Sequence, residues 1–156
     1  MQKMNIYEIL DPKRTYSNLT ASSKKKAIEF IAEVISSSLP SLQQGEIYRG
    51  LIEREKLGTT AIGEGVAIPH CRLSKCDKIV GGLFVFNEAL DFSAPDERGV
   101  NIIFSLLVPE NETRQHLEAL AMIAEGFSNP EKKQQLLEAH NDKKLYEAAL
   151  TIGTKP

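Results

Sequence analysis

Apolar positions in the first third of the chain recur with the period of an α-helix. From Ser22 onward they follow the i, i+3, i+4, i+7 spacing, which predicts a helix with one buried face. The serines at 36–38 and Pro40 predict its end, because proline breaks the hydrogen-bond ladder of a helix. A second helix is expected over residues 44–57, closed by Gly58. The expected inward residues are Ala27, Ile28, Ile31, Ala32, Val34 and Ile35 in the first helix, and Ile47, Leu51 and Ile52 in the second.

The middle of the chain carries shorter apolar runs, which are typical of β-strands. The run over residues 100–108 is nearly continuous, interrupted only by Asn101 and Ser105, and Pro109 stops it. Such a run predicts a strand that is buried on both faces, at the centre of a sheet. The other strands are expected at residues 59–62, 66–68 and 79–86, the first two joined by the glycine turn 63–65.

The spacing becomes helical again after residue 110. Asn111 or Thr113 can cap a helix there, a shorter helix is expected to begin at Asn129-Pro130, and Asp142 can cap a last one. The expected inward residues are Leu117, Leu120, Ala121, Ala124 and Phe127 in the first of these helices, Leu136 and Leu137 in the second, and Leu145, Ala148 and Ala149 in the third.

The two ends of the chain carry weaker signals. In the N-terminal segment, residues 1–21, a few apolar residues are expected to form a short helical turn or strand, and Asp11-Pro12 a turn. Residues 153–156 are expected to be a frayed tail. Together the elements predict a single α/β domain over residues 1–156, in which helices flank a mixed β-sheet.

Composition and charge narrow the class of protein. Of the 156 residues, 42% are hydrophobic, which supports a packed core and argues against disorder. The 19 basic residues do not exceed the 21 acidic ones, so no nucleic-acid partner is expected, and the basic cluster at 24–26 is interpreted as a solvated helix start. No window approaches the ~20 apolar residues of a membrane span, and residues 1–10 lack the apolar core of a signal peptide. A cytoplasmic protein without membrane insertion is therefore expected.

The strongest candidate for chemistry is the histidine that ends the sequence GEGVAIPH, residues 63–70. A glycine turn leads into a short apolar run, and Pro69 restricts both its own backbone and that of the residue before it. His70 is therefore expected at the tip of a rigid element. Its imidazole titrates near neutral pH and can act as a nucleophile. The alternative is an unreactive, hydrogen-bonded turn histidine, and the rigid surroundings bring the two interpretations to about equal weight.

Two further residues are candidates for which a structural role is favoured when each is taken alone. His116 lies in the first turn of its helix, either as a helix-edge residue or as a neutral imidazole beside a bound anion. Arg54 lies in the charged sequence 53–56, either on a solvated face or as a guanidinium that neutralises an oxyanion. His140, near the end of a helix, is interpreted as structural or neutral.

Neither a metal nor a cofactor is expected. Cys71 and Cys76 are a poor framework for a disulfide, and with His70 they lack the familiar spacing of a metal site. Cys71 and His70 are adjacent, and adjacent residues do not naturally hydrogen-bond as nucleophile and base. The sequence contains neither a phosphate-binding loop motif nor a dinucleotide fingerprint.

Two longer stretches together resemble one protein family. Residues 54–70, REKLGTTAIGEGVAIPH, are similar to the signature of enzyme IIA of the fructose/mannitol class (type 2) in the bacterial phosphoenolpyruvate-dependent phosphotransferase system. The sequence LLVP at 106–109, followed by His116-Leu117, is similar to the second motif of the family. The resemblance covers nearly the whole chain and implies the mannitol-type enzyme IIA fold.

The resemblance implies a role for each candidate residue. His70 matches the histidine that accepts a phosphoryl group on Nε2 from an HPr-type phosphocarrier protein. Arg54 matches an arginine that neutralises the phosphoryl charge, and His116 matches a second histidine that hydrogen-bonds to it. No metal is needed for this chemistry. Two positions depart from many members, because Cys71 replaces a glycine and Glu64 replaces an asparagine.

The resemblance allows more than one output. A chain without IIB and IIC domains, with a segment before its first helix, resembles the regulatory, nitrogen-related branch, in which a regulatory target protein senses the phosphorylation state. The first alternative is the IIA component of a fructose- or mannitol-type sugar transporter, which passes phosphate to a IIB domain. The second alternative is a non-catalytic binding module in which His70 is not phosphorylated.

Overall fold

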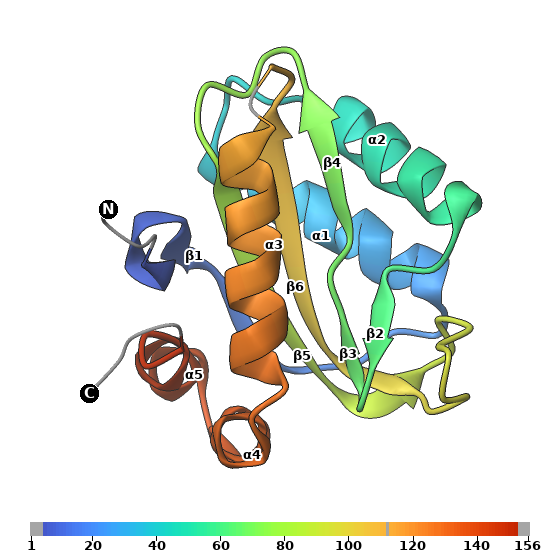
Figure 1. The fold of residues 1–156 in the computed structure, drawn as a ribbon, viewed down its shortest axis with the longest axis vertical. Coiled ribbons are helices and arrows are strands. Elements are labelled where there is room, and N and C mark those ends of the chain that lie inside the picture. Colours follow the sequence, from blue (N-terminus) through green and yellow to red (C-terminus); the bar gives the residue numbers. More distant parts are fainter. Residues whose placement is uncertain (1–4, 112, 153–156) are drawn as a thin grey trace.

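Six strands and five α-helices build the part of the chain that the computed structural model describes, residues 5–111 and 113–152 (Figure 1). No helix within these residues is long and apolar enough to span a membrane. The expected frayed tail lies outside them. The elements in chain order are the 3₁₀-helix η1 (Ile6–Glu8), β1 (Leu10–Leu19), α1 (Lys24–Ser38), α2 (Gln44–Leu57), β2 (Ala61–Gly63), β3 (Val66–Ala67), β4 (His70–Leu73), β5 (Val80–Leu90), β6 (Val100–Pro109), α3 (Arg114–Phe127), α4 (Pro130–Glu138) and α5 (Asp142–Ala149).

The strands form one mixed sheet in the spatial order β1-β5-β6-β3-β2. On one side β6 lies antiparallel to β5, and on its other side it pairs in parallel with β3 and then with β4. β3 and β4 therefore occupy consecutive parts of the same side of β6, joined by Ile68 and Pro69. β1 runs parallel to β5 at one edge, and β2 lies antiparallel to β3 at the other. The expected α/β fold with a mixed sheet is confirmed.

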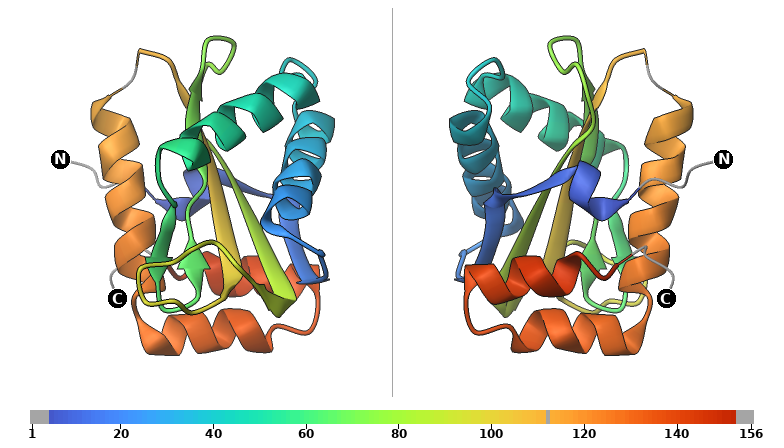
Figure 2. Two further views of the ribbon diagram at one scale, coloured as in Figure 1. Left: turned by 90° about the vertical axis from the view of Figure 1, so that its right-hand side faces the viewer. Right: turned by 90° about the vertical axis from the view of Figure 1, so that its left-hand side faces the viewer.

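Helices cover both faces of the sheet, with α1 and α2 on one face and α3, α4 and α5 on the other (Figure 2). Neighbouring strand residues contribute to opposite faces, as the pleat requires. Phe84 and Ile103 pack beneath α1 and α2, whereas Leu83 and Ile102 pack beneath α3. Residues 102–108 of β6 are all buried, which confirms the predicted central strand.

The short helical turn expected near the start of the chain is η1, but the ten-residue length of the strand β1 that follows was not predicted. It contains Asp11-Pro12, which were expected to form a turn. Proline is tolerated here because β1 is an edge strand, where a missing N–H need not break a ladder hydrogen bond. Its register with β5 shifts between Leu10 and Thr15 and again between Tyr16 and Leu19, which weakens the alternation that would have revealed the strand.

The inward face of α3 is offset from the expected one. Leu117 is 61% exposed and Ala121 is also exposed, so these two assignments were wrong. The buried residues of this helix are His116, Ala119, Ile123 and Phe127. The predicted stripe contained apolar residues only, whereas an imidazole fills the inward position nearest the start of the helix. The His116 ring therefore lies on the buried side of α3, which faces the sheet.

The other helices follow the sequence pattern more closely. Ser23 caps α1, and α2 ends at Gly58 as predicted. Two details differ from expectation. Leu137 is 46% exposed, and Asn141 rather than Asp142 caps α5, because the Asn141 side chain accepts a backbone N–H of the first turn.

Candidate functional site

His70 is the first residue of β4, immediately after the break between β3 and β4. On the near side of the break, the Ile68 N–H donates to the carbonyl oxygen of Thr60 over 3.0 Å. On the far side, the Leu106 N–H of β6 donates to the carbonyl oxygen of Pro69 over 2.9 Å. Pro69 thus interrupts a strand that resumes with His70, instead of ending it as expected. The backbone on both sides of the histidine is fixed by the sheet.

A backbone carbonyl orients the imidazole of His70. Its Nδ1 atom lies 2.8 Å from the carbonyl oxygen of Ile68. Because a carbonyl oxygen only accepts, Nδ1 must carry the hydrogen, and in the neutral ring Nε2 then keeps its lone pair. The side chain is half-buried, so this nucleophilic nitrogen belongs to a ring that reaches the surface.

The imidazole of His116 lies beside that of His70. Their ring centroids are 5.3 Å apart and the rings are inclined by 63°. The resemblance assigns both rings to one phosphoryl group and so implies that they lie close together, which this distance confirms. His116 is 7% exposed, and both its ring nitrogens are buried without a hydrogen-bond partner among the described residues. A buried polar atom without a hydrogen-bond partner lowers the stability of the folded protein. Its presence indicates a place where a bound ligand can supply that partner.

Both histidines are held in the neutral form. Burial lowers the pKa of His70, and the nearby Arg54 charge lowers it further, while the hydrogen bond to Ile68 and the Glu55 carboxylate oppose the shift. Burial also lowers the pKa of His116, helped by His70 and by the charge of Arg72. A neutral imidazole is the nucleophilic form of histidine, so the lowered pKa values are compatible with attack by a ring nitrogen.

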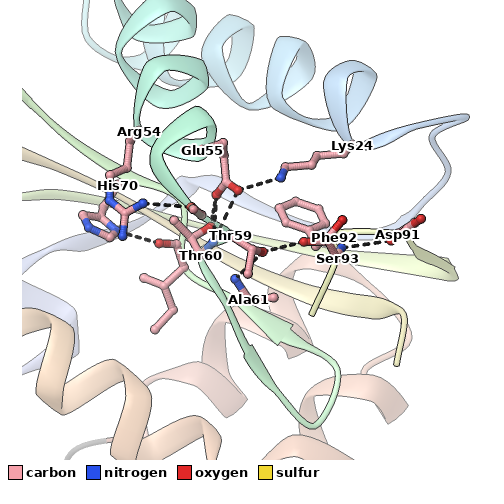
Figure 3. Close-up of polar contacts among 12 residues, drawn as sticks. Lys24, Arg54, Glu55, Thr59, Thr60, Ala61, His70, Asp91, Phe92 and Ser93 are labelled. Atoms are coloured by element: carbon pink, nitrogen blue, oxygen red, sulfur yellow. Dashed lines mark hydrogen bonds and ion pairs between the residues drawn. The ribbon is translucent and has the colours of Figure 1, made fainter. Parts of the chain in front are cut away.

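Arg54 reaches the site from the last turn of α2. Its Nη1 donates to the carbonyl oxygen of Gly58 over 2.9 Å, which bends the side chain over the start of the next loop. Figure 3 shows the guanidinium next to the His70 ring, in agreement with its effect on the pKa of that ring. The structure thus brings together the three residues singled out in the sequence, while the roles assigned to them stay predictions.

Sequence reasoning missed a second guanidinium at the site. Arg72 follows His70 by two positions on β4, so the two side chains share a face of the strand. It is exposed, and its charge is close enough to lower the pKa of His116. Had β4 been predicted, the alternation of side chains along a strand would have placed Arg72 on the same face as His70.

Cys71 is turned away from this site. It packs in the core beneath α1 and α2, where a Cβ atom added to Gly50 would lie only 2.8 Å from its Sγ. Burial raises the pKa of the thiol to about 12, so it stays protonated. The described residues contain no group of three or more His, Cys, Asp and Glu side chains that could hold a metal ion. The Cys71 side chain therefore lies on the opposite face of β4 from the histidine site.

Glu64 lies in the turn between β2 and β3, at the other end of β3 from His70. Its carboxylate pairs with Arg98 at 2.9 Å and with Lys133 at 3.7 Å. These contacts hold its charge at the turn. His140 is exposed and follows α4, outside the site.

Comparisons with known proteins agree with the resemblance inferred from the sequence. Residues 8–150 match the family described as the phosphoenolpyruvate-dependent sugar phosphotransferase system, EIIA 2. A nitrogen regulatory protein from Pseudomonas aeruginosa is 36% identical over 149 residues, covering 96% of this chain and 97% of that protein. A fructose-specific EIIA component from Haloferax volcanii is 28% identical, covering 77% and 78%.

Solved structures give the same result. The nitrogen regulatory protein IIA-Ntr from Neisseria meningitidis superposes with a TM-score of 0.85 at 34% identity, over 92% of this chain and 98% of that one. The mannitol IIA from Escherichia coli superposes with a TM-score of 0.74 at 17% identity, over 89% and 97%. The second likeness bears on the fold alone, and it confirms the expected mannitol-type architecture.

Proposed function

Because the chain belongs to the EIIA type 2 family of the phosphoenolpyruvate-dependent sugar phosphotransferase system, we propose that it is a cytoplasmic phosphoryl carrier with a regulatory output. His70 accepts the phosphoryl group from a phosphohistidine on an HPr-type carrier protein and later gives it up. The observation that carries this proposal is the pair of neutral histidines, 5.3 Å apart, in which the His70 Nε2 atom is left free.

The transfer needs no proton to move. The Nε2 lone pair of His70 attacks the phosphorus, the P–N bond to the donor breaks, and its electron pair returns to the donor imidazole. The Nδ1 hydrogen stays in place, bonded to the carbonyl oxygen of Ile68. Catalysis of this kind is mostly positioning and charge stabilisation, which the fixed ring supplies.

The other two residues of the site, Arg54 and His116, act on the phosphoryl oxygens. Arg54 neutralises their negative charge, and the N–H of His116 donates a hydrogen bond to them. That bond gives the buried His116 ring the partner it lacks within the described residues. The guanidinium can offer two parallel N–H donors, a geometry that suits phosphoryl oxygens better than a single ammonium does.

The regulatory output rests on the relatives. Nitrogen regulatory proteins from several bacteria align with nearly the whole chain at 33–36% identity. The second candidate, a IIA component that passes phosphate to a IIB domain, is favoured by the fructose-specific relative from Haloferax volcanii. A purely non-catalytic module is disfavoured, because it would not need a complete set of two neutral histidines and an arginine.

Incubation with phosphoenolpyruvate, enzyme I and an HPr-type carrier tests the proposal. Intact mass spectrometry should then show one added phosphoryl group, and ATP alone should add none. An unchanged mass with the complete donor system would overturn the proposal. The phosphorylated protein is then mixed with a fructose-type IIB domain. Rapid transfer of its phosphoryl group to IIB would favour the sugar-transport function over the regulatory one.

A further inference from the structure

A buried carboxylate lies behind the site, on the residue that follows Arg54. The Glu55 side chain is only 4% exposed, and its carboxylate pairs with the Lys24 ammonium at 2.7 Å. It also accepts the Thr60 N–H, with Oε1 at 3.2 Å and Oε2 at 3.3 Å, and the Thr60 hydroxyl (Figure 3). A buried charge persists only where it is paired and hydrogen-bonded, and here all of these contacts converge on one loop.

Hydrogen bonds to the backbones of two residues connect this carboxylate to the His70 imidazole. Glu55 holds the N–H of Thr60, and the Thr60 carbonyl oxygen accepts the Ile68 N–H over 3.0 Å. The Ile68 carbonyl oxygen in turn receives the His70 Nδ1 hydrogen over 2.8 Å. The backbones of two residues, Thr60 and Ile68, therefore link the carboxylate to the ring. In each residue the N–H and the carbonyl belong to different peptide groups joined through Cα, so the link fixes backbone position and does not pass polarisation from one hydrogen bond to the next.

We propose that Glu55 is a positioning residue for His70. By fixing the backbone of Thr60 and, through it, that of Ile68, Glu55 holds the imidazole as the tautomer with Nε2 unprotonated. The proposal rests on the proposed function in one respect only: the freed Nε2 is the atom that would take the phosphoryl group. A carboxylate that orients a histidine and fixes its tautomer is a known device of catalytic sites, although here it acts at a distance.

The backbone and the side chain of Glu55 together fix the loop that holds Arg54. The Gly58 N–H donates to the Glu55 carbonyl oxygen over 3.1 Å, and the Gly58 carbonyl oxygen accepts the Arg54 guanidinium. Thr60, two residues further on, is tied to the Glu55 side chain. The segment 58–60 is thus anchored at both ends to a single residue, and the arginine and the histidine take their positions from it.

The charge of Glu55 also has the sign that the transfer requires. When Nε2 bonds to phosphorus while Nδ1 keeps its hydrogen, the imidazole becomes positively charged. Glu55 raises the pKa of His70, which means that it favours the positively charged ring, whereas Arg54 opposes it. Because the ring charge develops during the reaction, this attraction is stronger in the product-like state than in the resting one.

The decisive measurement is ¹⁵N NMR of the His70 ring in the unphosphorylated protein, together with the phosphorylation rate. Glu55→Gln keeps the size of the side chain but removes its charge. Thr60→Val removes the hydroxyl and keeps the backbone hydrogen bonds, and Thr60→Ser restores the hydroxyl. The control is Thr15→Val, which removes another buried hydroxyl, bonded to the Asp11 carbonyl oxygen on β1, far from this network.

Wild type should show a protonated Nδ1 and an unprotonated Nε2. Glu55→Gln should mix the two tautomers and slow phosphorylation about tenfold or more, by analogy with other residues that orient a reactive group. Thr60→Val should change both readouts in the same direction, Thr60→Ser should recover them, and Thr15→Val should leave the ring signals as in wild type.

Unchanged ring signals in both Glu55→Gln and Thr60→Val would overturn the proposal, even if the variants were slow or unstable. An equal rate loss in Thr15→Val would also overturn it, since general destabilisation would then explain the effect. Failure of the wild type to be phosphorylated would instead contradict the proposed function, and the tautomer comparison would still decide the role of Glu55.

Discussion

The Nδ1 atom of His70 lies 2.8 Å from the carbonyl oxygen of Ile68, two residues earlier in the chain. Pro69 lies between the two residues, and its fixed φ angle restricts the backbone to a geometry that allows this contact. The nitrogen that we propose as the nucleophile, Nε2, is therefore unprotonated before any partner protein binds. A ring that needs no reorientation loses little entropy on reaching the transition state. Such positioning of the reacting groups is the main way in which a protein catalyses phosphoryl transfer.

Replacement of this histidine should abolish phosphorylation. His70→Ala removes the only atom proposed to attack phosphorus, so no added mass is expected under conditions that label the wild type fully. The matched control is His140→Ala, which removes an exposed histidine outside the site and should be labelled normally. Labelling of the His70→Ala protein would place the phosphoryl group on another residue.

Arg54→Ala should slow phosphoryl transfer with little effect on folding. The side chain is half-buried at the end of α2 and bonds a single carbonyl, so its loss should lower the free energy of unfolding by under ~0.5 kcal/mol. Arg54→Lys should rescue the rate only in part, because an ammonium lacks the planar fork. Stopped-flow or quench kinetics measure the rate.

Arg49→Ala is the control for that prediction, since Arg49 is an exposed arginine on the same helix. If it slowed the transfer as much as Arg54→Ala does, the effect would come from the overall charge of α2 and not from a contact with the phosphoryl group.

His116→Leu should make the protein more stable and less active. The substitution replaces two buried nitrogens that have no partner among the described residues, so the free energy of unfolding should rise by about 1 kcal/mol. Phosphorylated protein should still form, but onward transfer should slow, because the phosphoryl group loses a hydrogen bond that orients it. Denaturant unfolding and transfer kinetics on the same samples test both parts, and a loss of stability would mean that the ring contributes packing or contacts that outweigh its missing hydrogen bonds.

Stability should decrease as the pH falls below about 6.5, the ordinary pKa of histidine. Burial is the main cause that lowers the pKa of both His70 and His116 in the folded protein. The unfolded chain therefore takes up protons that the folded one does not, and the free energy of unfolding falls until the pH is below the folded pKa values. Unfolding midpoints measured across this range should fall less steeply for His116→Leu. Equal slopes for the two proteins would contradict the assigned shift.

Sequence reasoning found three residues that the structure brings together but not the surroundings in which they lie. The types and spacing of Arg54, His70 and His116 were visible as motifs. The strand after Pro69 was not, because the sequence HCRL does not alternate clearly between apolar and polar residues, and Arg72 was missed with it. The inward position of His116 was also missed, since a polar ring does not extend an apolar stripe.

The burial of Glu55 could not be inferred from its neighbours in the chain. It lies within the charged sequence 53–56, which predicts a solvated face. Its burial depends on Lys24, far away in sequence, whose ammonium pairs with it and lies 4.9 Å from the centre of the Phe92 ring. Lys24 was therefore wrongly interpreted as part of a solvated helix start. Only the packing of α1 against α2 brings the two charges together.

Arg72→Ala tests the residue that only the structure revealed. Removing its positive charge should raise the pKa of His116, because a like charge nearby disfavours protonation of the imidazole. It should also slow the phosphorylation of His70 modestly, since an exposed guanidinium is screened by water and salt. Arg98→Ala is the control, because Arg98 is paired with Glu64 at the other end of β3. An NMR titration of His116 gives the pKa in each variant. The same pKa in wild type and Arg72→Ala would mean that Arg72 turns into solvent and takes no part in the site.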